Sequence, residues 1–374
     1  MINVFQPSIG AVELEAVQRV FRSNWVGKGK VTDEFEAAFA KHLGVPRENI
    51  TSVSCCTEGL FQSIQALGLR EGDEVILPTI SFVGAANAIA ASGAKPVFCD
   101  VHPQNLNATV ADIEQQLTPR TRAILLLHYG GAPYQLAMIK DLAEKRQIFL
   151  IEDAACSVAS RSGETACGTF GDIGVWSFDA MKILVCGDGA MVYCKDPAMV
   201  KKIASSSYLG MNTSSGLASK AEERWWEFEI DTFGRRAVMN DISSAIGLVQ
   251  LKRLPQFVSH RKDIAYLYDR ELKGLSWLTL PPKVSAQDTS SYYLYHVQLE
   301  EGRDKLARFL KEKGIYTTFR YYPLHYVKKY GSTSKLVCAE RAAKQTLCIP
   351  IHQSLQDEEA HRVVDAIKAF GSTW

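Results

Sequence analysis

The stretch that decides the fold reads AILLLHYGGAPYQLAMIKDLAEKRQIFLIED and runs from Ala123 to Asp153. Its first five residues are apolar, and a second apolar run follows at 148–151. Between them, residues 136–146 carry apolar side chains at helical spacing. Continuous apolar runs joined by an amphipathic helix indicate strands that are buried on both faces of a parallel sheet.

The same alternation extends from about residue 50 to residue 200. Further apolar runs predict strands at 50–54, 74–77, 96–99, 174–178 and 190–193. The longer segments between them predict helices at 57–69, 82–92 and 110–117. We therefore expect an α/β fold with a mostly parallel, seven-stranded sheet between helices. In such sheets the loops that leave the carboxyl ends of strands form the ligand site.

The segments that flank this core are less regular. A helix before it should have Thr32 as its N-cap and Gly44 just past its end. The polar and aromatic stretch at 205–235 is too long for a plain connection and is expected to be functional. Two helices, at 240–252 and 256–273, should follow it. We expect a large domain over residues 1–250 and a smaller C-terminal α/β domain over residues 251–374.

The composition excludes several classes of protein. The chain has 374 residues, and its 42 basic residues are balanced by 41 acidic ones. This balance gives no general electrostatic attraction to nucleic acid or to an anionic membrane. No apolar run is long enough to span a bilayer, and the first residues lack a signal-peptide pattern. Nine cysteines occur without zinc-like spacing, which is typical of reduced thiols and predicts no metal site. We expect a cytoplasmic protein.

Two residues at strand ends suggest chemistry. Residues 174–190 read GVWSFDAMKILVCGDGA, so Lys182 follows a predicted strand and has apolar residues next to it in sequence. Burial lowers the pKa of a lysine and makes its amine a usable nucleophile. Asp153 ends another strand, where a carboxylate can pair with a pyridinium nitrogen. Taken alone, such a lysine is more often exposed to solvent, and such an aspartate is more often a helix cap.

Two more elements complete a candidate ligand-binding site. Residues 53–60, VSCCTEGL, run from a strand into a helix, whose first N–H groups at Cys56 and Thr57 can bind a phosphate. Phe82 leaves another strand and could stack on a flat ring. Separately, Thr57 is better explained as a cap and Phe82 as a core residue. Together, a phosphate site, a stacking aromatic, a carboxylate and an imine-forming lysine are the parts of a pyridoxal 5'-phosphate site.

Several short motifs follow one another in a fixed order. They are SNWVGKG (23–29), FEAAFA (35–40), GDEVILP (72–78), GAKPVFCD (93–100), HYGGAP (128–133), EDAA (152–155), SF (177–178) before Lys182, ND (240–241) before AIG (245–247), YPLH (322–325) and IPIH (349–352). In these motifs the chain resembles, over essentially its full length, the DegT/DnrJ/EryC/StrS family of pyridoxal-phosphate-dependent sugar-nucleotide aminotransferases.

The resemblance implies a fold-type-I enzyme and a reaction. By it, an amino group would pass in ping-pong fashion from glutamate to a nucleotide-linked keto-deoxysugar, such as a dTDP-4-keto-6-deoxyhexose or its 3-keto counterpart. Lys182 would form the Schiff base with the cofactor and move protons. Asp153 would keep the pyridine nitrogen protonated. Members of the family form homodimers with shared active sites, so we expect a homodimer here.

The resemblance also implies the remaining contacts. The cofactor contacts would be Cys56, Thr57, Phe82, Cys156, Ser177 and Arg236, and the substrate contacts Trp25, Lys28, His128, Tyr321 and His325. The amine of Lys28 could bind the diphosphate of the sugar nucleotide. Each histidine could equally be a packed or surface residue. The Trp225-Trp226 pair could cover a sugar or a base, or could pack at a subunit interface.

Three positions depart from the family pattern. Cys156 stands where glutamine is usual, and Asp179 stands where histidine is usual. Arg236 occupies the position of an asparagine that reaches the cofactor phosphate of the neighbouring subunit. As a charged donor it could bind that phosphate more strongly, or it could face the diphosphate of a sugar nucleotide.

Three other functions are known for proteins with this kind of fold or site. The dehydratase branch of the family replaces the lysine by histidine, so Lys182 argues against it. A cysteine desulfurase would need a mobile catalytic cysteine, and neither Cys338 nor Cys348 lies in a suitable loop of small residues. A non-catalytic, cofactor-binding regulatory member would be signalled by loss of Lys182 or Asp153, and both are present.

Overall fold

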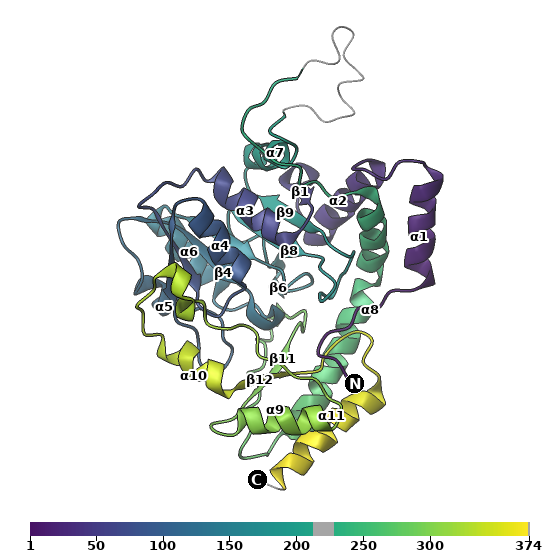
Figure 1. Cartoon of the computed structure of the whole chain (residues 1–374), viewed down its shortest axis with the longest axis vertical. Helices are drawn as coiled ribbons and strands as arrows, with labels where there is room; N and C mark the ends of the chain where they lie inside the picture. The colour runs from purple at the N-terminus through teal and green to yellow at the C-terminus, as the bar shows by residue number, and fades with distance from the viewer. Residues whose placement is uncertain (212–227, 373–374) are drawn as a thin grey trace.

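The structure, a computed structural model, describes residues 1–211 and 228–372 (Figure 1). Its centre is a seven-stranded sheet in the order β1-β9-β8-β5-β4-β2-β3. These strands are β1 Ile50–Val53, β2 Glu74–Pro78, β3 Lys95–Cys99, β4 Thr121–Leu127, β5 Phe149–Asp153, β8 Ile173–Ser177 and β9 Ala190–Cys194. Strand β9 is antiparallel to both of its neighbours, while the other pairs are parallel. The mostly parallel sheet is therefore confirmed, and each predicted strand is found.

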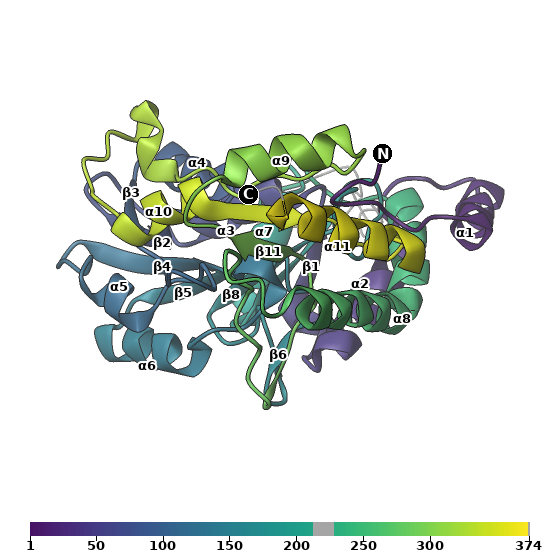
Figure 2. The same cartoon turned by 90° about the horizontal axis from the view of Figure 1, so that it is seen from below.

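Helices cover both faces of the sheet (Figure 2). They are α3 Cys56–Ala66, α4 Val83–Ala91, α5 Val110–Glu114, α6 Leu136–Arg146 and α7 Pro197–Ser206. Successive side chains of a strand point to opposite faces. In β2, Val75 and Leu77 accordingly share an apolar cluster with α3 and α4, whereas Ile76 belongs to the cluster of α5 and α6. This burial on both faces explains why the strands read as continuous apolar runs.

The predicted cap of helix α2, Lys30–Leu43, is wrong. Gly29 is the N-cap, and Thr32 lies inside the helix, fully buried. The carboxylate of Asp241 accepts hydrogen bonds from the N–H groups of Gly29 and Thr32 at 2.9 and 3.0 Å, and from the Thr32 hydroxyl at 2.7 Å. A side chain distant in sequence therefore caps this helix. Gly44 ends it with φ 80°, as predicted.

The two helices expected at 240–252 and 256–273 form one. Helix α8, Asp241–Leu272, continues through Pro255. It packs against α1, Ala11–Arg22, and α2 near one end and against α11, Asp357–Gly371, near the other. Leu254 and Phe257 belong to the core around the large sheet, while Ile264 and Tyr268 belong to a second core. Packing on both sides of Pro255 therefore offsets the hydrogen bond that proline cannot donate.

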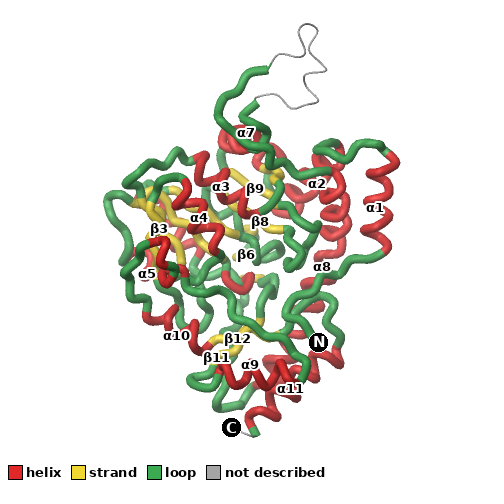
Figure 3. Tube along the Cα trace, in the orientation of Figure 1, coloured by secondary structure: helices red, strands yellow, loops and turns green. Residues whose placement is uncertain are grey.

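The C-terminal part is smaller (Figure 3). It has its own apolar cluster. Its elements are β11 Tyr295–Gln298, α9 Arg303–Glu312, the short 3₁₀ turns Leu324–Tyr326 and Lys328–Tyr330, α10 Val337–Gln345, β12 Thr346–Ile349 and α11. Strands β11 and β12 pair antiparallel. Besides the main sheet and the β11–β12 pair there is a three-stranded sheet in the order β10-β6-β7. Its strands are β10 Asp288–Thr289, β6 Arg161–Ser162 and β7 Thr165–Ala166. We propose that the chain divides into two domains near residue 250, with α8 shared between them.

Within the described residues, none of the helices has the length and apolar character needed to cross a membrane. All nine cysteines are free thiols.

Candidate active site

The carboxyl ends of the parallel strands bring the predicted chemistry to one edge of the sheet. Strand β5 ends at Asp153, whose carboxylate is 1% exposed, and β8 ends at Ser177, which is also buried. Lys182 lies in the loop that follows β8. Cys56 begins α3 directly after β1, and Phe82 caps α4 after β2. Strands β1, β2, β5 and β8 all run in the same direction, so residues more than 120 positions apart in sequence lie at the same edge of the sheet.

Asp153, Cys56 and Cys156 each interact electrostatically with Lys182. Burial raises the pKa of the Asp153 carboxyl, and the nearby Lys182 ammonium only partly opposes this effect. Burial likewise raises the pKa of both thiols, and Lys182 again opposes it. One oxygen of Asp153 accepts a hydrogen bond from the N–H of Ala155 at 3.1 Å. A buried carboxylate beside an amine, with thiols kept neutral, therefore forms the centre of the site.

The pKa of Lys182 differs from the sequence-based expectation. Burial acts to lower this pKa, as expected, but Tyr293, Cys156 and other acidic phenol and thiol groups act to raise it. The net direction is well above the usual value. The Lys182 amine lies over the ring of Tyr293, 4.8 Å from its centroid.

The predicted phosphate end of the site is an open helix terminus. Cys55, not Thr57, caps α3, and its sulfur accepts a hydrogen bond from the N–H of Glu58 at 3.4 Å. Gly84 keeps this region open, because a Cβ there would stand 3.2 Å from both the Thr57 hydroxyl and the Phe82 ring. The first N–H groups of a helix have no intrahelical acceptor and favour an anion. The geometry at Cys56 and Thr57 fits a phosphate.

An aromatic side chain from the small domain completes the cluster. Phe82 is 44% exposed, so it is not the core residue of the alternative explanation. Its ring meets the edge of Tyr321, with 6.1 Å between centroids. The hydroxyl of Tyr321 lies 3.9 Å from the sulfur of Cys156. The unusual cysteine at position 156 thus contacts an aromatic residue from the C-terminal part of the chain.

The predicted substrate residues are more dispersed. The amine of Lys28 donates to the buried carboxylate of Glu36 at 3.0 Å, and the Trp25 indole donates to the carbonyl of Lys28 at 3.1 Å. Buried His128 pairs with Glu152 at 2.9 Å. His325 is buried as well, and its Nδ1 lies 2.7 Å from the Thr79 hydroxyl.

These contacts bear on the expected roles. The ammonium of Lys28 already neutralises a carboxylate, and both histidines have partners inside the protein. The structure therefore favours the packed-histidine alternative for His128 and His325. Substrate contact at Trp25 and Tyr321 remains a prediction.

Arg236 lies on the surface of the chain. The Arg236 guanidinium is exposed and lies 5.2 Å from the centroid of the Tyr208 ring. Its predicted contact with a phosphate would need a second subunit or a bound ligand, and it stays a prediction. The Trp225-Trp226 pair lies outside the described residues.

Several residues at the site were missed by the sequence reasoning. Arg261 is 1% exposed and donates to the carbonyl oxygens of Tyr292 and Tyr293 at 3.0 and 2.9 Å. It also donates to the Gln353 side chain at 2.8 Å, and Gln353 donates to the carbonyl of Ile183 at 3.2 Å. This network joins the backbone next to Lys182 to that of Tyr293. A basic residue in the apolar stripe of a helix was the one signal that could have revealed it.

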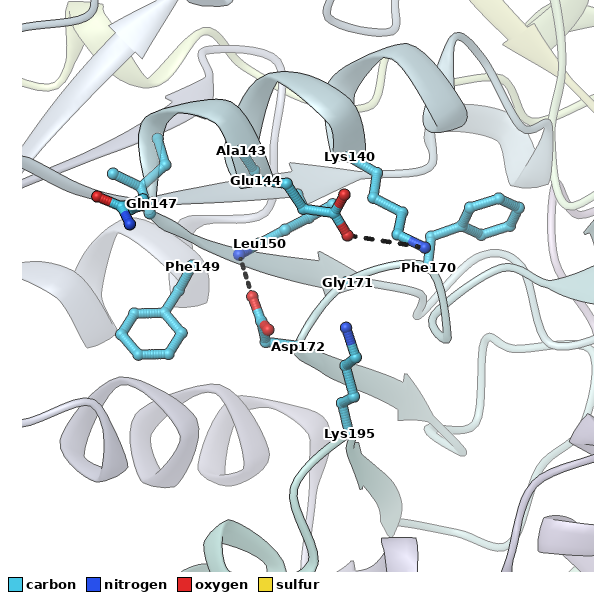
Figure 4. A pocket seen from close by; sticks show the side chains of 11 residues that line it. Lys140, Ala143, Glu144, Gln147, Phe149, Leu150, Phe170, Gly171, Asp172 and Lys195 are labelled. Carbon is cyan, nitrogen blue, oxygen red and sulfur yellow. Dashed lines mark hydrogen bonds and ion pairs between the residues drawn. The ribbon is translucent and has the colours of Figure 1, made fainter.

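A pocket also lies at the opposite edge of the sheet (Figure 4). It is formed where β5 and β8 begin, and its polar lining includes Lys140, Glu144, Asp172 and Lys195. Asp172 accepts a hydrogen bond from the N–H of Leu150 at 2.9 Å, and Lys140 lies 3.9 Å from Glu144. Because it is at the amino ends of the strands, this pocket is not part of the candidate active site.

Comparison with known proteins identifies the class. The crystal structure of the aminotransferase TlmJ from Streptoalloteichus hindustanus has a TM-score of 0.95 and 52% sequence identity, covering 100% of this chain and 99% of that one. DesV of S. venezuelae, solved in complex with a ketimine intermediate, has a TM-score of 0.86 and 27% identity, covering 96% and 94%. The expected fold class is confirmed, and the protein is an aminotransferase.

The family follows directly. The chain belongs to the DegT/DnrJ/EryC1/StrS aminotransferase family, whose model matches residues 7–368. A relative from Saccharopolyspora spinosa, the dTDP-4-dehydro-2,3,6-trideoxy-D-glucose 4-aminotransferase, is 49% identical over 98% of this chain and 95% of its own length. The resemblance inferred from the motifs is confirmed.

Proposed function

We propose that this protein is a pyridoxal-5'-phosphate-dependent aminotransferase that acts on a nucleotide-linked keto-deoxysugar. The amino group would come from glutamate, in two separate half-reactions. The relative from Saccharopolyspora spinosa is named for a 4-keto sugar linked to dTDP, and its 49% identity supports a dTDP-4-keto-deoxyhexose over a 3-keto substrate. The single observation that carries the proposal is the position of Lys182, in the loop after β8 and in electrostatic contact with the buried Asp153, at the carboxyl edge of the sheet.

The residues present fit the cofactor. Asp153 is buried, and its raised pKa means that the ammonium of Lys182 does not fully compensate its desolvation. A protonated ring nitrogen would supply the missing positive charge. Within the residues that the structure describes, the Lys182 side chain forms no hydrogen bond or ion pair, so its amine would be free to react with a carbonyl carbon once it has lost its extra proton. The first N–H groups of α3 would bind the phosphate.

Each side chain then has a defined task. When bound, the cofactor supplies an electron-withdrawing ring next to the amino-bearing carbon. Asp153 would hold a proton on the ring nitrogen through its negative charge. Lys182 would take a proton at Nζ from one carbon and return it to another, since its amine lies where the proton must move. Phe82 would pack on one face of the ring, while Ser177 and the N–H groups of Cys56 and Thr57 would bind the phosphate.

The test uses the visible absorbance of the purified protein. Bound cofactor should give a band that glutamate bleaches, and borohydride reduction should leave a pyridoxyl adduct on the peptide that contains Lys182. The variant Lys182→Ala should form no adduct, whereas Lys140→Ala, which changes a lysine of the opposite edge, should behave like the wild type. An adduct on another lysine would overturn the proposal. Binding without bleaching by any amino donor would favour a regulatory member.

A screen of substrates tests the sugar. After the cofactor has taken up the amino group, a dTDP-4-keto-deoxyhexose should restore the original band, and the GDP-linked counterpart should do so more slowly. Recovery with a 3-keto isomer alone would overturn the proposed position of amination.

We also propose that the protein is a cytoplasmic homodimer. The free state of all nine thiols supports a reducing compartment. Apolar side chains exposed on and near α1, including Val12, Phe21 and Trp25, support a surface that is covered by a second subunit. Sedimentation should give twice the mass of the chain. A fully active monomer at low concentration would exclude shared active sites.

A further inference from the structure

The hydroxyl of Tyr321 lies beside the centre of the candidate active site. It is 3.9 Å from the sulfur of Cys156, which is buried just beyond the end of β5. Both side chains interact electrostatically with Lys182. Burial raises the pKa of the phenol and of the thiol, so both keep their protons. Because a thiol is only a weak hydrogen-bonding group, Tyr321 has a strong donor next to a weak partner.

Two contacts hold Tyr321 against the loop that carries Phe82. The centroids of the Tyr321 and Phe82 rings are 6.1 Å apart and their planes meet at 64°, an edge-on arrangement that aromatic pairs favour. Close by, the N–H of Leu324 donates to the carbonyl of Thr79 at 2.9 Å. The C-terminal part of the chain is thereby joined to the loop after β2, which limits where the hydroxyl can move.

The proposed anchors define how a pyridoxal ring would lie in the site. Asp153 would hold the ring nitrogen, Lys182 would join the aldehyde carbon, and the start of α3 would take the phosphate. In pyridoxal phosphate the ring nitrogen and the carbon that bears the aldehyde are opposite each other. One edge of the ring between them carries the phosphate arm, and the other edge carries the 3-oxygen. The 3-oxygen would therefore lie on the side away from α3.

Cys156 and Cys56 approach Lys182 from different sides. Strand β8, which leads to Lys182, lies between β1, which leads to α3, and β5, which leads to Cys156. Cys56 is the first residue of α3. Each of the two thiols interacts electrostatically with both Asp153 and Lys182. The side of Cys156, where the hydroxyl of Tyr321 lies, is therefore the side of the 3-oxygen.

We infer that Tyr321 donates a hydrogen bond to the 3-oxygen of bound pyridoxal phosphate. This inference rests on the proposed function, and it assigns Tyr321 to the cofactor rather than to the substrate. The 3-oxygen is acidic because its ring withdraws electrons, so a neutral phenol would give it a charge-assisted hydrogen bond. Tyr293 is less suited, because the face of its ring lies under the Lys182 amine and its hydroxyl accepts from Arg320 at 3.4 Å.

The size of residue 156 agrees with this assignment. Cys156 stands where glutamine is usual in the family, and cysteine has the shorter side chain. The thiol therefore leaves room for the phenol of Tyr321, whose hydroxyl is the stronger donor of the two.

The test compares two cofactors on the apoprotein. Dissociation constants are measured by quenching of tryptophan fluorescence, for pyridoxal 5'-phosphate and for its 3-deoxy analogue, which lacks the oxygen in question. In Tyr321→Phe, the preference for the natural cofactor over the analogue should fall by about 10- to 100-fold relative to the wild type, since a hydrogen bond to a charged group is lost. Phenylalanine keeps the ring contact with Phe82, so binding of the analogue should change less than about threefold.

The visible band of the bound cofactor gives a second readout. A negative 3-oxygen favours a proton on the nitrogen through which Lys182 is joined to the cofactor, and a donor to that oxygen weakens the effect. The midpoint pH of the band should therefore rise by about one unit in Tyr321→Phe.

Controls separate this contact from other roles. Tyr316→Phe, which changes an exposed tyrosine of the C-terminal part, should match the wild type in both measurements. If Cys156→Ala abolished the preference and Tyr321→Phe did not, the thiol would be the donor and the inference would be overturned. Equal weakening of both cofactors in Tyr321→Phe, with a lower unfolding temperature, would assign a structural role and overturn it as well. Failure of the proposed function is recognised separately, because the wild type itself would then form no visible band with pyridoxal phosphate.

Discussion

Replacing Arg261 by methionine should strongly destabilise the fold. The side chain is buried and donates three hydrogen bonds, to the carbonyls of Tyr292 and Tyr293 and to Gln353, at 2.8–3.0 Å. Burial lowers the pKa of this guanidinium to about 10, so keeping it charged inside the protein is already costly. Methionine removes that cost, but it leaves one buried and two partly buried acceptors without this donor, at about 1–3 kcal/mol each. We expect a net loss of about 3–5 kcal/mol, as for other broken buried charge contacts.

The assay is urea unfolding, with the free energy of unfolding extrapolated to water. Arg261→Lys keeps the charge but cannot reach three acceptors at once, so it should lose less than the methionine variant. Arg270→Met, on an exposed face of the same helix, should stay within about 0.5 kcal/mol of the wild type. Because Arg261 also orders the backbone beside Lys182 through Gln353, amino transfer should weaken together with stability. A loss below about 1 kcal/mol in Arg261→Met would refute the reasoning.

Three further changes test the site and the core. Asp153→Asn should reduce amino transfer by about 100-fold or more while the chain still folds, because the charge that holds the ring proton is lost; near-normal turnover would contradict this. His352 is buried, and burial lowers its pKa to about 4. Its contribution to the free energy of unfolding is therefore complete above pH 6.5 and is lost as the pH falls towards 4, by up to about 1.4 kcal/mol per pH unit. The stability of His352→Gln should therefore fall less steeply over that range, and equal slopes would be inconsistent with this account. Gly174→Ala should cost at least about 3 kcal/mol in urea unfolding, since its Cβ would meet the carbonyl oxygen of Gly168 across the sheet edge.

Much of the large domain was accessible from the sequence. Each strand of the main sheet is buried on both faces and therefore reads as a short apolar run, which is why the boundaries agree to within two residues. Lys182, Asp153 and Phe82 follow strand ends, and parallel strands place their ends at one edge. Family motifs along the whole chain then connected these residues to one cofactor.

Contacts between distant side chains were not accessible in the same way. Thr32 looked like a helix cap because the sequence does not show that Asp241 reaches the same helix start. Pro255 looked like a helix end because the packing on both sides of it is tertiary. For His128 the sequence left open substrate contact or a packed role, because its partner Glu152 is recognisable only when β4 and β5 are adjacent.

The sequence by itself determined the order of strands and helices and the chemical groups that reach the sheet edge, because these depend on local periodicity and on single residues at strand ends. Only the tertiary structure decided the charge state and the surroundings of those groups. Lys182 has a raised rather than a lowered pKa because of Tyr293 and Cys156, which come from different segments of the chain. Burial and distance depend on the whole fold, and sequence spacing does not contain them.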